Sequence, residues 1–314
     1  MRFPSLLLLL PILFLAPSLT RANDAASLQG MVMGVAAYSL FAVHDAVVKG
    51  VIFDLPVVQI LFVRSVVIAL ICLAIGRRQM LRDLAASPNK PMLLIRAILM
   101  LAAWCLYYPA GQQLKLAEMT TLYYVAPAIT IILAVIFLKE RLTLIRVAAA
   151  AIGFFGVVVA ANPAGISLGL PAFMALTAAF LWAVAMILMR KISKNESSLV
   201  IVFSVNAFYI VVLGVIAVPL WQPMDLRMIG SVIAIGVIGG LAQFVLIEAA
   251  RRVPASVLGT VEYSALVWSF VFGFLFWREE PALVVYLGAA LVIASGLVLA
   301  WSERRVRGRI VDTP

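Results

Sequence analysis

The sequence predicts an all-α membrane protein with ten transmembrane helices, arranged as two five-helix repeats that are inverted relative to each other. Hydrophobic residues make up 65% of the 314 residues and charged residues only 12%, against about 45–50% and about 25% in soluble domains. The apolar residues form long continuous runs, which favours helices over the alternating strands of a membrane barrel. Two stretches in the two halves of the chain also resemble each other.

Ten apolar runs are long enough to cross the hydrocarbon core of a bilayer, which needs roughly 20 helical residues. Turn-forming or charged residues separate the runs, for example at 54–56, 162–165 and 194–196. No connection is long enough to form a separate soluble domain. The predicted spans are 28–48, 56–76, 92–112, 119–138, 144–161, 168–189, 198–219, 228–249, 256–276 and 282–301.

The basic residues between the spans set the predicted orientation. Sixteen of the 24 lysines and arginines follow even-numbered spans, and four follow odd-numbered spans. Cytoplasmic loops carry such an excess of Lys and Arg. We therefore predict a bacterial-type inner-membrane protein whose even-side loops and basic tail, residues 302–314, are cytoplasmic. Because the net charge of +10 lies in these short clusters, it does not indicate a nucleic-acid partner.

Residues 1–27 conflict with this orientation. Arg2, an apolar stretch at 5–19 and the segment Thr20-Arg21-Ala22 resemble a secretory signal peptide, whose cleavage would leave the mature N-terminus outside. Three interpretations are open: a cleaved signal, a retained extra segment, and a start codon assigned upstream of the true one. We follow the charge asymmetry, because it rests on five loops and the signal rests on one segment.

An internal repeat relates the two halves of the chain. Residues 117–160 and 254–300 each have a start with Thr and small residues, an aromatic-rich helix, a Phe-x-x-Glu ending and a second apolar helix. Each half then has five spans, and an odd number of spans turns one half upside down relative to the other. Inverted repeats are typical of secondary transporters, whose substrate site lies near the midplane between the halves. The matched pairs are Phe137 with Phe276 and Glu140 with Glu279.

These features resemble the drug/metabolite transporter superfamily, and specifically proteins with two EamA domains. The resemblance is carried by the helix from Ala117 to Glu140, the Pro254-Ala255-Ser256 start and the stretch from Glu262 to Trp268. It implies a first EamA repeat at 28–161, a second at 168–301 and two cytoplasmic termini. It also implies transport of small organic solutes: amino acids and related metabolites outward in many members, and S-adenosylmethionine or riboflavin inward in some.

The first span carries three ionisable groups, His44, Asp45 and Lys49. Residues four apart share a helix face, so we predict that Asp45 pairs with Lys49. His44 points about 100° away from Asp45 around the helix, so we predict no contact between these two. Two interpretations are open for the group: an interfacial ion pair that fixes the first helix to a neighbour, or charges on the path of a solute or proton.

Two further charges lie deep in predicted spans. Glu262 is predicted either to be hydrogen-bonded to a neighbouring helix or to bind a proton or a cationic group of the solute, since an unpaired carboxylate there costs about 2.5–3.5 kcal/mol. Arg64 needs Asp45, Glu262 or a substrate anion as its partner. Arg96, near the edge of its span, is predicted to snorkel to the interface. Nearer the surface, Glu248 is predicted to pair with Arg251 or Arg252.

Aromatic and polar residues within the spans are candidate walls of a solute cavity, since ligand pockets combine apolar surface with a few polar groups. We expect Pro127 to kink the fourth span and to act as a hinge. Gly30-x-x-x-Gly34 and Gly236-x-x-x-Gly240 predict close helix packing. The candidate lining residues are Trp104, Tyr123, Tyr124, Trp182, Gln243 and Tyr263, of which Tyr123-Tyr124 and Tyr263 occupy repeat-related positions.

The sequence thus predicts a secondary active transporter, exporter or importer, of a small organic metabolite such as an amino acid or a cofactor-like solute. Within the resemblance the alternative is uptake of S-adenosylmethionine or riboflavin. From other classes the alternatives are a non-transporting membrane helper and an intramembrane enzyme. The chain has no nucleotide-binding loop, and its single histidine and two dispersed cysteines give no metal cluster. We therefore expect no cofactor, no metal and no catalytic role; coupling ion and oligomeric state, monomer or dimer, stay open.

Overall fold

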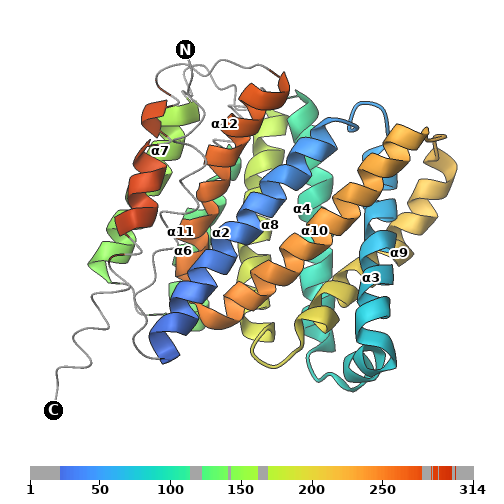
Figure 1. The fold of residues 1–314 in the computed structure, drawn as a ribbon, viewed down its shortest axis with the longest axis horizontal. Helices are drawn as coiled ribbons and strands as arrows, with labels where there is room; N and C mark the ends of the chain where they lie inside the picture. Colours follow the sequence, from blue (N-terminus) through green and yellow to red (C-terminus); the bar gives the residue numbers. More distant parts are fainter. Residues whose placement is uncertain are drawn as a thin grey trace.

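The structure is a bundle of helices that run side by side (Figure 1). The computed structural model describes residues 22–113, 122–140, 143–161, 169–277, 284, 286–288, 290–298 and 301. Within these residues every regular element is helical and no strand occurs, so the predicted all-α fold class is confirmed. Residues 1–21 of the signal-like segment and the basic tail at 302–314 lie outside the described residues.

Among the described residues, six helices are long and apolar enough to cross a membrane, and each overlaps a predicted span. Their outer faces present large exposed apolar side chains such as Leu70, Ile75 and Val211, a surface that lipid can cover. A multi-pass membrane protein accounts for both features. The six helices are α2 (Ala22–Lys49), α3 (Val57–Ala86), α4 (Lys90–Gln113), α8 (Leu170–Ile192), α9 (Ser198–Ala217) and α10 (Leu226–Arg252).

Two of the predicted spans contain breaks in the helix. The span predicted at 256–276 is not continuous, because α11 (Ala255–Glu262) and α12 (Ser264–Trp277) are separated at Tyr263. A turn at Tyr124 and Val125 likewise precedes α6 (Ala126–Leu138). The other described helices are η1 (Val218–Leu220), α7 (Leu144–Ala161) and the apolar helix Tyr286–Val298, described apart from residue 289.

Pro127 lies in the first turn of α6 rather than inside a longer helix. Backbone N–H groups of a first turn have no intrahelical partner, so the N–H that proline lacks is not missed there. The predicted kink within a continuous fourth span is therefore replaced by a break just before Pro127. The role of Pro127 as a hinge stays a prediction.

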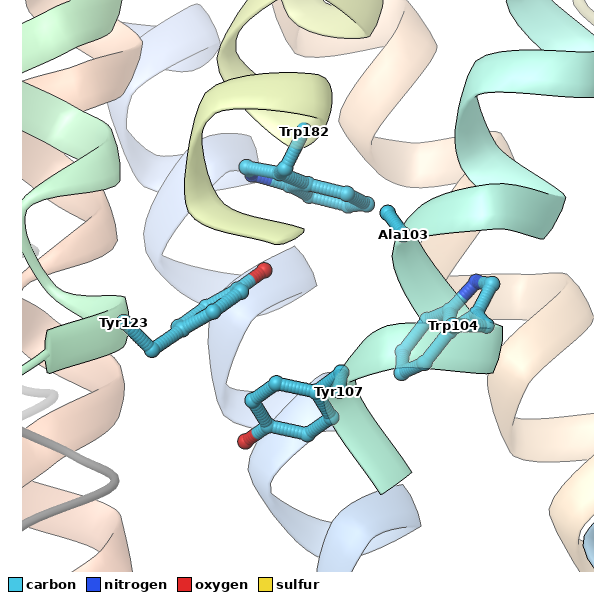
Figure 2. Close-up of a pocket in the computed structure, with 5 residues that line it drawn as sticks. All are labelled: Ala103, Trp104, Tyr107, Tyr123 and Trp182. Carbon is cyan, nitrogen blue, oxygen red and sulfur yellow. The ribbon is translucent and has the colours of Figure 1, made fainter. Parts of the chain in front are cut away.

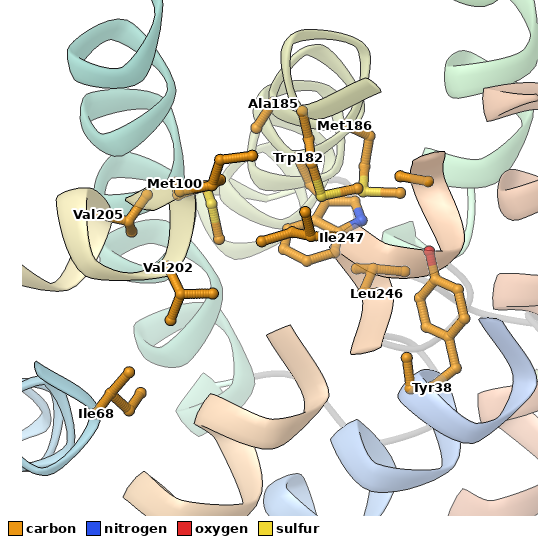
Figure 3. Packing of buried hydrophobic residues seen from close by; sticks show 14 of the residues in the cluster. Tyr38, Ile68, Met100, Trp182, Ala185, Met186, Val202, Val205, Leu246 and Ile247 are labelled. Atoms are coloured by element: carbon orange, nitrogen blue, oxygen red, sulfur yellow. The ribbon is translucent and has the colours of Figure 1, made fainter. Parts of the chain in front are cut away.

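Helices from the two halves of the chain pair with each other. α2 packs along α10, α3 along α9, and α4 along α8, while α6 contacts both α8 and α11. Figure 1 shows α2 and α10 lying side by side across the bundle. The apolar core therefore forms between the halves, where side chains of α2, α3, α4, α8, α9 and α10 meet (Figure 3).

Glycines allow the closest of these helix contacts. A Cβ added at Gly30 would lie 2.7 Å from Cβ of Arg252, and one added at Gly236 would lie 2.6 Å from Cβ of Val67. Both distances are shorter than side chains tolerate, so α2 and α3 can approach α10 only because these positions lack a Cβ. The prediction that the two glycine motifs permit close helix packing is confirmed.

Replacing Gly236 with alanine should destabilise the bundle. The new methyl group would force α3 and α10 apart, and overpacking of this kind costs about 1–3 kcal/mol. The matched control is Gly230→Ala on the same helix, where an added Cβ meets nothing within 4 Å and the better helix former should be neutral or slightly stabilising. Thermal unfolding midpoints of both variants in lipid nanodiscs check this, and equal midpoints would contradict the close contact of α3 with α10.

Candidate functional site

A small cavity lies between α4, the segment just before α6, and α8. It is lined by Ala103, Trp104, Tyr107, Tyr123 and Trp182. Figure 2 shows the side chains of Tyr107, Tyr123 and Trp182 around a common space. The cavity volume is about 10 Å³, which leaves room for about one water molecule. Three predicted lining residues, Trp104, Tyr123 and Trp182, are brought together here.

Contacts between rings hold the cavity walls in position. Trp104 stacks on Tyr108 with 5.1 Å between ring centroids, and Tyr107 meets Tyr123 edge to face at 4.7 Å. Tyr107 is absent from the residues predicted to line the site. Its position could have been predicted from its spacing of three residues from Trp104, because residues three and four apart share one helix face.

His44 on α2 is fully buried beside the cavity and contacts two charged side chains. Its Nδ1 lies 3.0 Å from Oδ1 of Asp45, and its Nε2 lies 3.3 Å from Nη1 of Arg64. The prediction that His44 and Asp45 make no contact is therefore wrong. Their side chains leave the helix in different directions, but neighbouring Cα atoms are only about 3.8 Å apart, so a short carboxylate can reach the nearer ring nitrogen.

The contacts of His44 assign its proton. A guanidinium can only donate hydrogen bonds, so Nε2 of His44 accepts from Arg64. In the neutral form of the ring, Nδ1 then carries the proton and donates a hydrogen bond to Oδ1 of Asp45. Arg64, His44 and Asp45 thus form a directed chain of hydrogen bonds that ends on a half-exposed carboxylate.

Arg64 is 2% exposed and has no carboxylate within 4.0 Å in the part of the chain that the structure describes. Its guanidinium carbon lies 5.3 Å from the ring centroid of Trp104, and its Nε has no hydrogen-bond partner there. A cation–π contact contributes about 0.5–2 kcal/mol, whereas burying an ion costs several kcal/mol. Of the three predicted partners, Asp45 reaches Arg64 only through His44, and Glu262 is held elsewhere.

Glu262 supplies a buried carboxyl group on another side of the cavity. It is the last residue of α11, is 3% exposed and accepts a hydrogen bond of 3.3 Å from the hydroxyl of Tyr38. The indole of Trp182 lies beside the Glu262 carboxyl group, although its N–H makes no hydrogen bond of normal geometry. The next residue, Tyr263, stacks on Tyr124 with 6.3 Å between centroids.

The remaining predicted residues lie away from the cavity lining. Gln243 pairs with Asn206 of α9 at 3.4 Å and does not line the cavity. The pairing of Lys49 with Asp45 stays a prediction. Glu248 binds Arg252 at 2.7 Å and Arg251 at 3.6 Å, as predicted.

Arg96 does not snorkel. Its side chain is 4% exposed, and two of its guanidinium nitrogens are buried without a hydrogen-bond partner among the described residues. The prediction from its position near the edge of a span is therefore wrong, because neighbouring helices cover that edge.

Comparisons with known proteins match this architecture over most of its length. The model of the EamA-like transporter family matches residues 28–162 and 169–301. The pseudopaline exporter of Pseudomonas aeruginosa is 27% identical over 282 residues, 88% of this chain and 97% of the exporter. The riboflavin transporter of Vibrio cholerae is 24% identical over 289 residues, 89% and 96% of the two chains. The S-adenosylmethionine uptake transporter of Rickettsia bellii is 26% identical over 203 residues, 62% and 68%.

A solved crystal structure shares the fold. It superposes with a TM-score of 0.73 at 19% sequence identity, and the match covers 90% of this chain and 98% of the other. The arrangement of helices is therefore common to both proteins.

Replacing Arg64 with methionine should leave the stability of the protein unchanged or raise it. Methionine fills a similar volume without a charge to desolvate, and such replacements of buried ions are neutral or stabilising by about 1–4 kcal/mol. Thermal unfolding in nanodiscs measures this, with the exposed Arg78→Met as the control. A midpoint that falls steeply in Arg64→Met alone would mean that the guanidinium is held by structural contacts rather than kept for a ligand.

Proposed function

The chain belongs to the EamA-like transporter family, and we propose that it is a secondary carrier that moves a small organic metabolite across a cell inner membrane by alternating access. Its relatives are transporters of small molecules, and its apolar helices make it a multi-pass membrane protein. The proposal adds the mechanism, the position of the site and the chemistry of the solute.

The observation that carries the proposal is a very small cavity beside a buried arginine and a buried carboxyl group. Arg64 lies behind Trp104 and Glu262 lies beside Trp182, and the centroids of the two indole rings are 6.5 Å apart. Sites for organic ligands have volumes of about 300–1,000 Å³, far above the cavity volume of about 10 Å³. A metabolite can occupy this position only if the helices on either side separate, which is the motion that alternating access requires.

The two helix breaks support the inverted repeat. In the register that matches Glu140 with Glu279, Tyr124 matches Tyr263. Both tyrosines lie at helix breaks, and their rings stack on each other. Residues that touch their own repeat mates lie close to the axis that relates the repeats. Discontinuous helices at such an axis are typical of transporters with ten or so spans in inverted halves, as proposed here for residues 28–161 and 168–301.

Polar contacts close one end of the bundle. Glu140, just after α6, accepts hydrogen bonds from the backbone N–H groups of Ala255 and Ser256 and from the Ser256 hydroxyl, at 2.9, 3.2 and 2.7 Å. Nearby loops are tied as well, because Glu196 accepts from Ser87 at 2.5 Å and from Asn89 at 2.8 Å. These contacts join the halves at the end that carries most of the basic loops, so we propose that they form the closed cytoplasmic gate.

The charges favour a solute that has both signs. The cation of Arg64 suits a carboxylate, Glu262 suits an ammonium group, and the aromatic rings between them suit apolar surface or a cation. An amino acid or a similar zwitterion combines these groups at a spacing that one cavity can hold. S-adenosylmethionine carries the same groups, whereas riboflavin lacks a carboxylate and an ammonium group.

Glu262→Gln should reduce solute exchange. A charge-assisted hydrogen bond is worth about 1.5–3 kcal/mol, so counterflow should fall about 10- to 100-fold. The assay is counterflow in proteoliposomes with labelled amino acids, S-adenosylmethionine, riboflavin and nucleosides. The exposed Asp83→Asn serves as the matched control. If folded Glu262→Gln exchanges the solute at the wild-type rate, the Glu262 carboxylate does not take part in binding the solute.

Glu140→Ala should loosen the proposed gate. Loss of its hydrogen bonds frees the first amide protons of α11, so their hydrogen exchange should accelerate about 10- to 100-fold in nanodiscs. The neighbouring exposed Lys139→Ala should leave the exchange of α11 unchanged. If α11 exchanges at the same rate in Glu140→Ala, the start of this helix is held by something other than the Glu140 carboxylate.

A further inference from the structure

A second buried arginine lies away from the aromatic cavity. Arg96 of α4 is 4% exposed, and its Nε and Nη1 atoms have no hydrogen-bond partner in the part of the chain that the structure describes. No carboxylate lies within 4.0 Å of it there. Arg96 precedes Trp104 by eight residues, a separation of about 12 Å along the helix. It is therefore a charged group that the proposed carrier site does not use.

Further unmet hydrogen-bonding groups gather beside Arg96. Tyr209 of α9 is fully buried, and its hydroxyl has no partner among the described residues. Tyr209 lies close enough to Arg96 and to Arg64 to interact electrostatically with both. The hydroxyl of Tyr108 is likewise buried without a partner and lies within the electrostatic reach of Arg64. Tyr209 thus lies within electrostatic reach of both arginines, while Tyr108, twelve residues or about 18 Å along α4 from Arg96, lies nearer to Arg64.

The surroundings of this region make an uncompensated charge costly. Met100, one turn from Arg96, and Val205, one turn from Tyr209, both pack in the apolar core (Figure 3). In such surroundings a cation without a counter-charge costs several kcal/mol, and a buried hydroxyl without a partner costs about 1–3 kcal/mol. The described chain supplies no acidic partner, so the compensating group comes from outside it.

The unmet groups select the chemistry of that compensating group. Arginine has donors and no acceptor, and a tyrosine hydroxyl can donate. The two guanidinium cations repel a cationic ligand and offer nothing to an apolar one. Together with the Tyr209 hydroxyl as a donor, they match an anion that accepts several hydrogen bonds.

We propose that a small monovalent anion, chloride or the carboxylate group of an organic solute, binds between Arg96 and Tyr209, within reach of Arg64. The site goes beyond the proposed carrier function and does not depend on it. If the anion is the carboxylate of a transported solute, Arg64 and Arg96 form two successive positions along its path. If it is chloride, it is a resident counter-ion that keeps both arginines charged.

The test is anion-dependent thermal unfolding of the purified full-length protein in lipid nanodiscs. Chloride and acetate are titrated at constant ionic strength against the large sulfonate MES. We expect a saturable rise of the unfolding midpoint with chloride or acetate, of about 2–6 °C at a hundredfold excess over Kd. A rise with chloride alone identifies an inorganic anion, and a rise with acetate alone or with both identifies a site that accepts carboxylates.

Variants locate the effect. Arg96→Gln and the nearly isosteric Tyr209→Phe should lose most of the anion-dependent rise, and the exposed Arg78→Gln should keep it. Tyr209→Phe retains the shape of the core, so it reports on the site even if Arg96→Gln fails to fold. A wild-type midpoint that ignores both anions, or a rise that persists in both site variants, would overturn the proposal and leave water as the group that solvates Arg96. Neither readout uses transport, so failure here is distinct from failure of the carrier proposal.

Discussion

Within a bilayer, every polar group must find its partner inside the protein, and this constraint organises the whole chain. Continuous helices satisfy it for the backbone along α2, α8, α9 and α10, whereas α3 has a kink with non-helical φ and ψ at Arg77. A broken helix frees backbone groups, and the bilayer tolerates such a break only where protein surrounds it. The breaks at Tyr124 and Tyr263 meet this condition because the two rings stack on each other inside the bundle. The positions of the breaks therefore mark the interior at which the two halves meet.

Not every buried charged or ionisable side chain finds a partner inside the protein. Asp45 is satisfied through His44 and remains half exposed, and Glu262 accepts from Tyr38. Arg64 and Arg96 keep unmet donors, so part of the free energy of folding is given up at these two positions. A chain selected for stability alone would carry apolar side chains there. In the proposals made above, these unpaired buried charges are the groups that bind a ligand.

The cavity and the closed end differ in the kind of contact that holds them. Pairs of aromatic rings such as Tyr107 with Tyr123 close the cavity, and each pair contributes about 0.5–1.5 kcal/mol beyond its buried area. Charge-assisted hydrogen bonds to Glu140 and Glu196 close the end of the bundle, at about 1.5–3 kcal/mol each. Rings can slide over one another without losing a specific partner, whereas the hydrogen bonds must break. In the proposed carrier the two closures would therefore open separately, so that the site faces one side at a time.

The sequence by itself determined that the chain lies in a bilayer, that it is all-α, where its long helices are and which family it belongs to. Long apolar runs and the Phe-x-x-Glu repeat are local features that can be read along the chain. It also identified Trp104, Tyr123 and Trp182 as candidate lining residues of a solute cavity, since aromatic residues with a polar tip combine the apolar surface and polar groups of a ligand pocket. Only the tertiary structure decided which charges meet. Three features depend on side-chain directions and on which helices cover which faces: the His44–Asp45 contact, the lack of a carboxylate beside Arg64 among the described residues, and the burial of Arg96. Helical periodicity fixes the face of a residue but not the neighbour across from it, because that neighbour comes from a helix far away in the chain.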